Sequence, residues 1–305
     1  MERAVLDPGE IRATVAEVGR QTGLDVRAAE LIKFTNNAVL RLPHAGVVLR
    51  IAGSAVIGLR AEKVVRVARL LRRHDVPAVR LWADGDDSMY PKTVRGHEIT
   101  IWDDVPSRRR PEATDLAALL RSVHGVGVGP VDLPPWDPIA GIRRRITSAT
   151  AVSAAVLRFL AAQCDEIAAE LAELDGGEPL LSRGLMHGDA FLGNVIVGPA
   201  GPVLCDFDST AWGPREWDLV AVAVGAQRFD YGADLQRRLA EAYGVDVTGW
   251  KGFDTLRRVR ELQLVTSVLP VLGANPGLRR QWRFRLNSLR RQDRDARWTP
   301  YSPIP

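Results

Sequence analysis

The sequence has few of the residues that mark disulfide-linked, metal-bound or membrane-spanning proteins. Only two of its 305 residues are cysteines, Cys164 and Cys205, and they lack the spacing of a structural metal site. Two such cysteines, with Cys205 in an apparent core strand, indicate a reducing cytoplasmic location. No apolar run approaches the roughly 20 residues that cross a bilayer, and residues 1–10 lack the basic and apolar regions of a signal peptide. We therefore expect a cytoplasmic protein without a membrane partner.

The composition is otherwise that of an ordinary globular chain. Hydrophobic residues make up 46% of the sequence, and the length suits one large or two closely packed domains. The formal net charge of +4 permits anionic partners without requiring them. No internal repeat or low-complexity segment is present. Composition therefore predicts a globular protein and leaves its function open.

Residues 185–208 carry most of the functional information in the chain. Two short apolar runs, at 195–197 and 203–205, flank a Gly/Pro-rich segment at 198–202. Such runs around a turn-forming segment predict a β-hairpin with a longer loop.

Acidic and amide side chains lie at the open end of this predicted hairpin. With the loop centred on Ala200, antiparallel pairing sets Asn194 opposite Asp206, and cross-strand partners have Cβ atoms roughly 5 Å apart. Oxygen ligands of this kind suit Mg²⁺, which takes few protein carboxylates and adds substrate phosphates. A further acid, Asp189, lies in the loop before the hairpin. An acid beside such a metal is what a hydroxyl nucleophile needs when it attacks a phosphate.

This stretch resembles the catalytic core of a known family. His187-Gly188-Asp189, Asn194 and Asp206-Phe207-Asp208 are similar in order and spacing to the motifs of the aminoglycoside phosphotransferase and choline kinase group. The resemblance implies that Asp189 is the catalytic base or hydroxyl-orienting acid and that Asn194 and Asp206 hold Mg²⁺. It implies supporting roles for His187 and Asp208. The alternative is a turn and a strand end whose acids are solvated.

These small-molecule kinases have a protein-kinase-like fold, so the resemblance implies an α+β protein with two lobes. Residues 1–104 would form the nucleotide-binding lobe, with an antiparallel sheet and a helix. Residues 105–305 would form a mainly helical lobe with the catalytic loop and the substrate-binding helices. The sequence agrees in the first lobe, where short β-rich segments predict a meander at 31–33, 39–42 and 47–51.

Arg50 lies in the third predicted strand, and Glu62 lies in the first turns of the helix predicted over 59–73. The resemblance implies that Arg50, oriented by Glu62, grips the α- and β-phosphates, at a position where protein kinases carry Lys. The alternative is a surface Arg on an edge strand and a solvated Glu. A Gly-x-Gly-x-x-Gly loop is absent, and residues 34–38 are its nearest counterpart.

Three further residues enter through the resemblance. Trp102 and Asp104 lie where the hinge of this fold would be, and the backbone there could bind a purine, although a core position is the commoner explanation for the tryptophan. Asp218 would accept hydrogen bonds from the catalytic-loop backbone, and an N-capping role is compatible with that. His124, at the end of a predicted helix, is expected to be structural.

The sequence therefore predicts a kinase that uses Mg²⁺ to move the γ-phosphoryl group of ATP or GTP to a small-molecule hydroxyl. The acceptor is an antibiotic such as an aminoglycoside, or a metabolite such as a sugar or an amino alcohol. Residues 279–297 hold many arginines and only the acids Asp293 and Asp295. That excess argues modestly against a polycationic acceptor, because buried like charges are costly.

Three other functions remain open from the sequence. A catalytically silent kinase-like protein would bind nucleotide or a protein partner. A nucleic-acid-binding protein has support only from the basic C-terminal segment, and we expect no nucleic acid partner. A metal hydrolase using His187, Asp189 and Asp206 would lack further histidine ligands. We expect a monomer or a weak dimer.

Overall fold

The computed structural model describes residues 6–34, 37–53, 58, 60–83, 90, 92–127, 133–175, 177–229, 231, 234–273 and 275–301. The chain divides into two compact units, the first made of Met1–Pro111 with Gly193–Ser209 and the second of Glu112–Leu192 with Thr210–Pro305. The segment 193–209 thus groups with residues that precede it by more than eighty positions. The functional assignment of 1–104 to nucleotide binding and 105–305 to catalysis stays a prediction.

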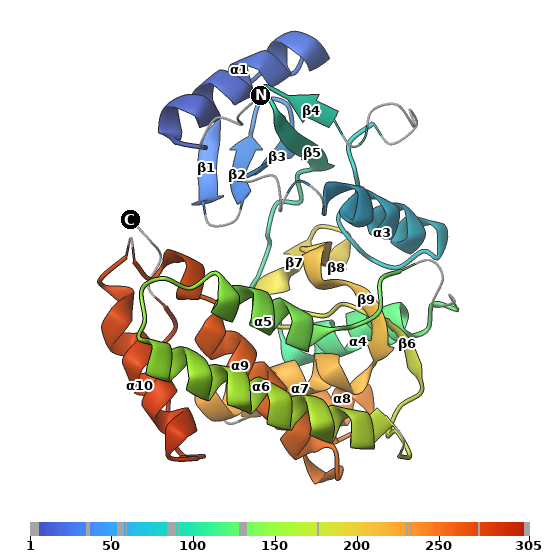
Figure 1. Cartoon of the computed structure of the whole chain (residues 1–305). Helices are drawn as coiled ribbons and strands as arrows, with labels where there is room; N and C mark the ends of the chain where they lie inside the picture. Colours follow the sequence, from blue (N-terminus) through green and yellow to red (C-terminus); the bar gives the residue numbers. More distant parts are fainter. Residues whose placement is uncertain are drawn as a thin grey trace. The chain divides into compact units, whose positions relative to one another are not determined.

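The first unit is built on a five-stranded antiparallel sheet (Figure 1). Its strand order is β1-β2-β3-β5-β4, with bounds Glu30–Phe34, Asn37–Leu42, Val47–Ala52, His97–Asp103 and Lys92–Val94 for β1, β2, β3, β5 and β4. Strict alternation of buried and half-buried residues along β2 gives the sheet one core face. The predicted meander is present as β1, β2 and β3, which pair in that order.

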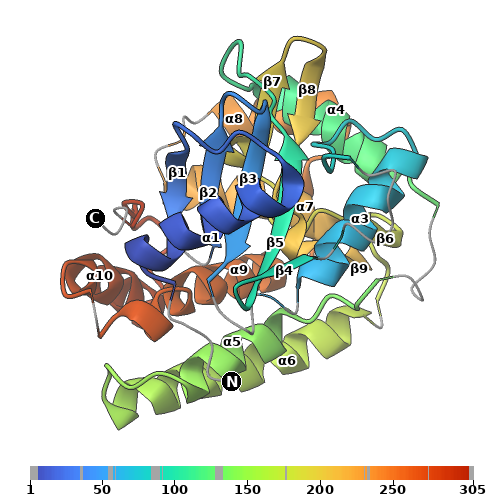
Figure 2. The ribbon, with the colours of Figure 1, turned by 90° about the horizontal axis from the view of Figure 1, so that it is seen from above.

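Two helices cover this sheet. Helix α1, Pro8–Thr22, begins where the Asp7 carboxylate accepts a hydrogen bond from the N–H of Glu10 and ends at Gly23, whose φ is 75°. It crosses in front of β1, β2 and β3 in Figure 2 and buries Ile11, Val15 and Val18 on one face. Helix α3, Ala61–Arg73, packs against β5.

The predicted hairpin is present, with a register one residue from the expected one. Strand β7, Val195–Gly198, pairs with β8, Gly201–Leu204, so that Val195 faces Leu204. The loop closes with two residues, and Gly201 adopts a φ of 114° that suits only glycine. Asn194 is therefore level with Cys205, and Asp206 lies one residue beyond. Cys205 follows β8 instead of lying in a core strand, and it is half-buried.

The second unit is mainly helical. The short strands β6, Arg183–Met186, and β9, Ala211–Pro214, pair with each other. The helices are α4 Ala113–His124, α5 Pro138–Thr147, α6 Ala154–Asp175, α7 Glu216–Arg228, α8 Asp234–Tyr243, α9 Phe253–Thr266 and α10 Leu278–Arg290. Short 3₁₀ turns are at Val247–Gly249 and Leu269–Val271. Helix α9 packs against α5, α6, α7 and α10, so it is the central helix of this unit.

Buried arginines fix residues 293–301 to this core. Arg228, only 2% exposed, pairs with Glu261 and donates from Nη1 to the carbonyl oxygens of Asp293 and Ala296 at 2.8 and 3.0 Å. Arg285, also 2% exposed, donates to the carbonyl of Thr299 and lies 5.3 Å from the Trp298 ring centroid. These contacts hold the segment after α10 against α7 and α9.

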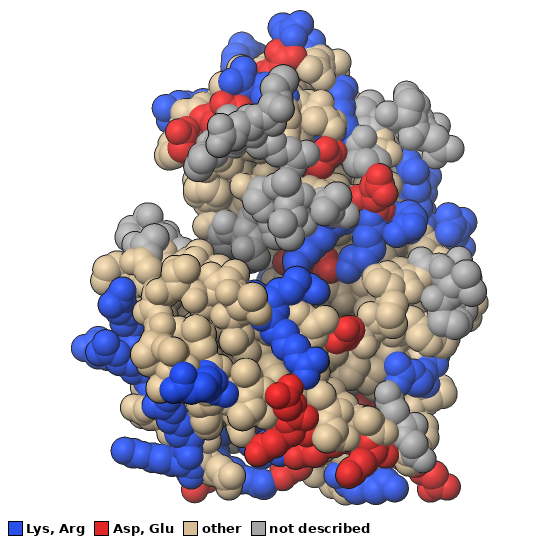
Figure 3. Space-filling view, in the orientation of Figure 1, with Lys and Arg blue, Asp and Glu red and all other residues tan. Residues whose placement is uncertain are grey.

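The other arginines of the basic C-terminal segment are mostly exposed, including Arg280, Arg283 and Arg290 on α10. Figure 3 shows basic side chains over α10 at the lower left and acidic side chains over α6 in the lower centre. The arginine excess therefore lies largely on the surface and says little about the acceptor. Within the described part of the chain, no helix is both long and apolar enough to span a membrane.

Candidate active site

The loop after β6 is held by one buried carboxylate. Asp218, in the first turn of α7, is fully buried and accepts hydrogen bonds from the N–H groups of His187 at 2.7 Å and Gly188 at 2.8 Å. Gly188 has a φ of 85°, which favours glycine, and its carbonyl accepts from Trp217 Nε1 at 2.9 Å. The predicted contact between Asp218 and the loop backbone is thus present. It fixes the direction in which the next residue, Asp189, leaves the loop.

His124 completes this support from α4. Its Nε2 lies 3.0 Å from Asp218 Oδ2, and its Nδ1 lies 2.7 Å from the hydroxyl of Tyr243. Burial alone would raise the pKa of Asp218, but hydrogen bonding and charge from His124 and the hydrogen bond from Gly188 outweigh it, and that pKa is lowered. His124 therefore has the structural role expected of it.

The lowered pKa of Asp218 makes the stability of the fold depend on pH, and a variant can test this. Its ordinary pKa is 3.8 and its folded pKa is lower. Just below pH 3.8 the unfolded chain therefore holds more protons than the folded one, and stability falls as the pH falls. We expect Asp218→Asn to be less stable than wild type at pH 7 and to lose less stability on acidification. Urea midpoints measured between neutral and strongly acidic pH test this. Asp165→Asn, at an exposed position, is the control, and parallel curves for D218N and wild type would contradict it.

Asp189 has an unexpected partner. Its Oδ1 accepts a hydrogen bond from Nη2 of Arg260, on α9, at 2.8 Å, and its side chain is 36% exposed. The Arg260 side chain is only 13% exposed, and its guanidinium carbon lies 5.9 Å from the Trp217 ring centroid. His187, whose Nδ1 faces the N–H of Asp189 at 3.3 Å, is buried. The predicted catalytic acid is thus accessible and paired with a cation.

The hairpin brings the two predicted metal ligands to one end. The N–H of Cys205 donates to the carbonyl of Asn194 at 3.0 Å, which places Asn194 beside the residue before Asp206. Asp206 has a φ of 66°, a left-handed conformation that Asp tolerates better than most residues. Asn194 is 5% exposed. The backbone therefore changes direction at Asp206, immediately after the hairpin.

The electrostatics of this end fit a divalent cation. Burial raises the pKa of Asp206, and so do the hydrogen bond with Asp208 and the negative charge of Asp208. Burial opposes ionisation of Asp208 as well, but the charge of Arg50 holds its pKa below the ordinary value. Two interacting half-buried carboxylates, with an amide oxygen nearby on the hairpin, are oxygen donors of the kind that suit Mg²⁺ when phosphate oxygens complete its ligands. Asn194 and Asp206 would be its protein ligands.

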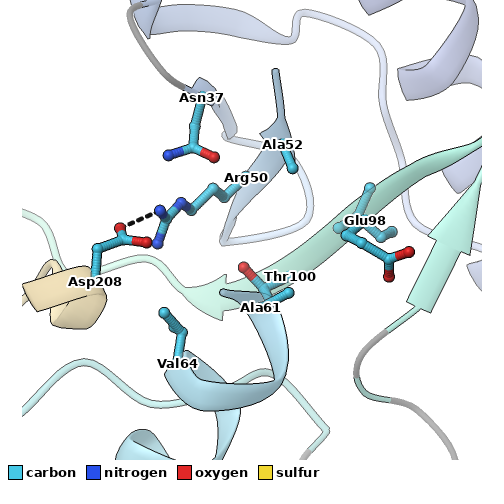
Figure 4. Close-up of a pocket in the computed structure, with 9 residues that line it drawn as sticks. Asn37, Arg50, Ala52, Ala61, Val64, Glu98, Thr100 and Asp208 are labelled. Carbon is cyan, nitrogen blue, oxygen red and sulfur yellow. Dashed lines mark hydrogen bonds and ion pairs between the residues drawn. The ribbon is translucent and has the colours of Figure 1, made fainter. Parts of the chain in front are cut away.

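Arg50 lines a small pocket in the first unit (Figure 4). The pocket is open to solvent, has about 250 Å³ of empty space when that open part is included, and is also lined by Asn37, Glu98, Thr100 and Asp208. The guanidinium forms an ion pair with Asp208. With its amide oxygen turned to Arg50, Asn37 accepts from Nη2 at 2.7 Å and from Nε at 3.2 Å. Arg50 is therefore held in place from both sides.

The other predicted residues of this unit, Glu62, Trp102 and Asp104, do not line this pocket. Glu62 was expected to orient Arg50, but it is exposed in the first turn of α3. Asp208 is the acid that pairs with Arg50 instead. Trp102 is 7% exposed and donates from Nε1 to the hydroxyl of Thr100 at 2.9 Å, as a core tryptophan does. Asp104 pairs with Arg41 at 3.1 Å. Residues 35 and 36 of the predicted phosphate loop lie outside the described residues.

Lys63 is a residue that the sequence interpretation did not single out. It follows Glu62 on α3, and its ammonium group donates to the backbone carbonyl of Asp208. Burial lowers the pKa of Lys63 to about 8. No local pattern in the sequence indicates that Lys63, and not Glu62, turns toward Asp208. Arg260 was also missed, since no local pattern on α9 distinguishes it from its neighbouring arginines.

Comparison with solved structures assigns the fold. A choline/ethanolamine kinase family protein from Mesorhizobium loti is 18% identical with a TM-score of 0.64, and the match covers 96% of this chain and 95% of that one. Spectinomycin phosphotransferase, solved with ADP and spectinomycin, is 16% identical with a TM-score of 0.60 and coverage of 91% and 93%. Amicoumacin kinase, solved with AMP-PNP and Ca²⁺, is 12% identical with a TM-score of 0.67 and coverage of 96% and 98%. The fold is therefore α+β and protein-kinase-like, as predicted.

The sequence itself identifies the family. The model of the phosphotransferase enzyme family matches residues 33–262, so the chain belongs to that family. A search of curated proteins found no match. The predicted resemblance and the prediction of a phosphotransferase enzyme are confirmed.

Proposed function

We propose that this phosphotransferase moves the γ-phosphoryl group of ATP or GTP to a hydroxyl group of a small molecule. The observation that carries the proposal is the buried Asp218, which binds the His187–Gly188 backbone and so presents Asp189. Relatives solved with ADP or AMP-PNP support a nucleoside triphosphate donor. The solved relatives include a spectinomycin phosphotransferase and a choline/ethanolamine kinase family protein. An antibiotic or a metabolite is therefore a suitable acceptor class.

Catalysis by this chain would rest on positioning and charge neutralisation, because phosphoryl transfer leaves little covalent work to the protein. Asp189 aligns the acceptor hydroxyl and takes its proton. Arg50, held by Asn37 and Asp208, offers its remaining N–H groups to the α- and β-phosphates. Asn194 and Asp206 would hold Mg²⁺, which neutralises phosphate charge when bound.

Melting temperatures measured with Mg²⁺-ATP and Mg²⁺-GTP test the donor without knowledge of the acceptor. A ligand that binds only the folded state raises the melting temperature by mass action, so we expect stabilisation by one or both nucleotides that requires Mg²⁺. Release of ADP or GDP is then followed with a panel of hydroxylated acceptors. Nucleotide binding without turnover of any acceptor would favour a catalytically silent protein. The absence of any shift would contradict the proposed function.

A further inference from the structure

The charges on α9 point to the chemistry of the acceptor. Arg257 pairs with Asp254 and Glu261, and Arg258 pairs with Glu166 and Glu170 of α6. Each of these two arginines thus has two carboxylates. Arg260 differs, because among the described residues its ion pair is with Asp189 alone.

The charge balance of this pair changes during the reaction. The acceptor oxygen forms a bond to the γ-phosphorus, the bond from that phosphorus to the bridging oxygen of the nucleotide breaks, and the hydroxyl proton goes to Asp189. Protonated Asp189 is neutral, so the mostly buried Arg260 loses its counter-charge. A buried cation that loses its partner is destabilised. A negative group on the acceptor would restore the balance and so favour the transition state.

The surroundings of Arg260 suit such a group. Its Nη1 donates to Gln263 Oε1 at 2.8 Å, and Nη1 of Arg145, on α5, lies 3.4 Å from the carbonyl oxygen of Gln263. Two guanidinium groups therefore contact Gln263, and one of them, that of Arg260, also contacts Asp189. Arg260 uses two of its five N–H donors in these contacts with Asp189 and Gln263. The others can bind a carboxylate or a phosphate oxygen.

We propose that the acceptor is a hydroxylated anion, whose carboxylate or phosphate group binds Arg260 while its hydroxyl faces Asp189. The proposal rests on the proposed function and narrows its acceptor class. Arg260 is then a specificity-determining residue. A cationic acceptor would meet like charge at the same place.

Small hydroxylated acceptors that carry an anionic, a neutral or a cationic group test this. One set is hydroxypropionate, hydroxypropionamide and aminopropanol, and a second set, glycerol phosphate against glycerol, distinguishes phosphate from carboxylate. We expect wild type to show a kcat/KM roughly 10- to 100-fold higher for the anion than for its neutral counterpart, the range of a charged hydrogen bond. Wild type should turn over aminopropanol least.

Arg260→Gln should reverse the order. It is expected to lower kcat/KM for the anion and to raise it for aminopropanol, which a merely structural loss would not do. Arg260→Lys should retain part of the preference, and Arg258→Gln, on the same helix but paired with α6, should retain all of it. For acceptors that are not turned over, calorimetric binding of each anion to wild type and R260Q replaces the rate.

Each other outcome overturns the proposal. An equal fall for all acceptors in R260Q would assign Arg260 to phosphoryl transfer or folding instead. A wild-type preference for amines, or an anion preference that survives R260Q, excludes an anionic acceptor at Arg260. Lack of turnover together with lack of Arg260-dependent anion binding does the same. Failure of the proposed function is separate, because it appears as the absence of a nucleotide-dependent melting shift.

Discussion

Replacing Asp189 by Asn is expected to lower kcat by on the order of 10²- to 10⁴-fold, the usual contribution of a positioned general base. Asparagine has the same shape, and its amide oxygen can still accept the hydrogen bond from Arg260. It cannot take the acceptor proton. Alanine would be a poorer test, since it would also remove the hydrogen-bond acceptor that asparagine keeps for Arg260.

The measurement is steady-state ADP or GDP release at saturating acceptor, with the nucleotide-dependent melting shift recorded for the same protein. The shift should match that of wild type, because Asp189 acts on the hydroxyl and not on the nucleotide. Asp234→Asn, at an exposed position on α8, is the control. A D189N protein with kcat within about threefold of wild type would remove Asp189 from the mechanism, since that difference is far below a general-base effect.

Replacing Asp206 by Asn is expected to weaken Mg²⁺-dependent nucleotide binding by on the order of 100-fold or more, since even indirect partners of a metal ligand cost 10- to 100-fold. The backbone at Asp206 has a φ of 66°, which asparagine adopts readily and alanine does not. The Asn variant therefore removes the charge and keeps the turn.

Titration of Mg²⁺ at fixed nucleotide, followed by melting temperature, measures this effect. The wild-type shift should saturate with Mg²⁺, and the D206N shift should require far more metal or be absent. Glu17→Gln, in an exposed pair on α1, controls for a general loss of charge. An unchanged Mg²⁺ dependence in D206N would mean that another group holds the metal.

The parts of the candidate site that are close together in the chain could be predicted from the sequence. The loop from His187 to Asp189 and the hairpin after it are local, so motif and strand pattern sufficed to find them. The register error has a local cause as well. The Gly/Pro-rich segment predicted a long loop, but Gly201 takes a left-handed conformation that allows a two-residue turn and moves every pair by one.

Contacts between distant positions could not be predicted in the same way. Arg50 pairs with Asp208, 158 residues away, and not with the nearer Glu62. Arg260 reaches Asp189 across 71 residues. Both pairs depend on how the strands, turns and helices pack against one another, and an arginine-rich sequence offers many equivalent candidates. The His124–Asp218 contact likewise depends on α4 packing beside the loop.

The buried arginines Arg228 and Arg285 have a practical consequence for engineering. Both are anchored to carbonyl groups of residues 293–301, so shortening the chain before this segment would remove these acceptors and leave Arg228 with Glu261 alone. The segment after α10 is thus part of the packed structure, and removing it is expected to destabilise the protein. Expression variants should keep it intact and place affinity tags at the other end of the polypeptide.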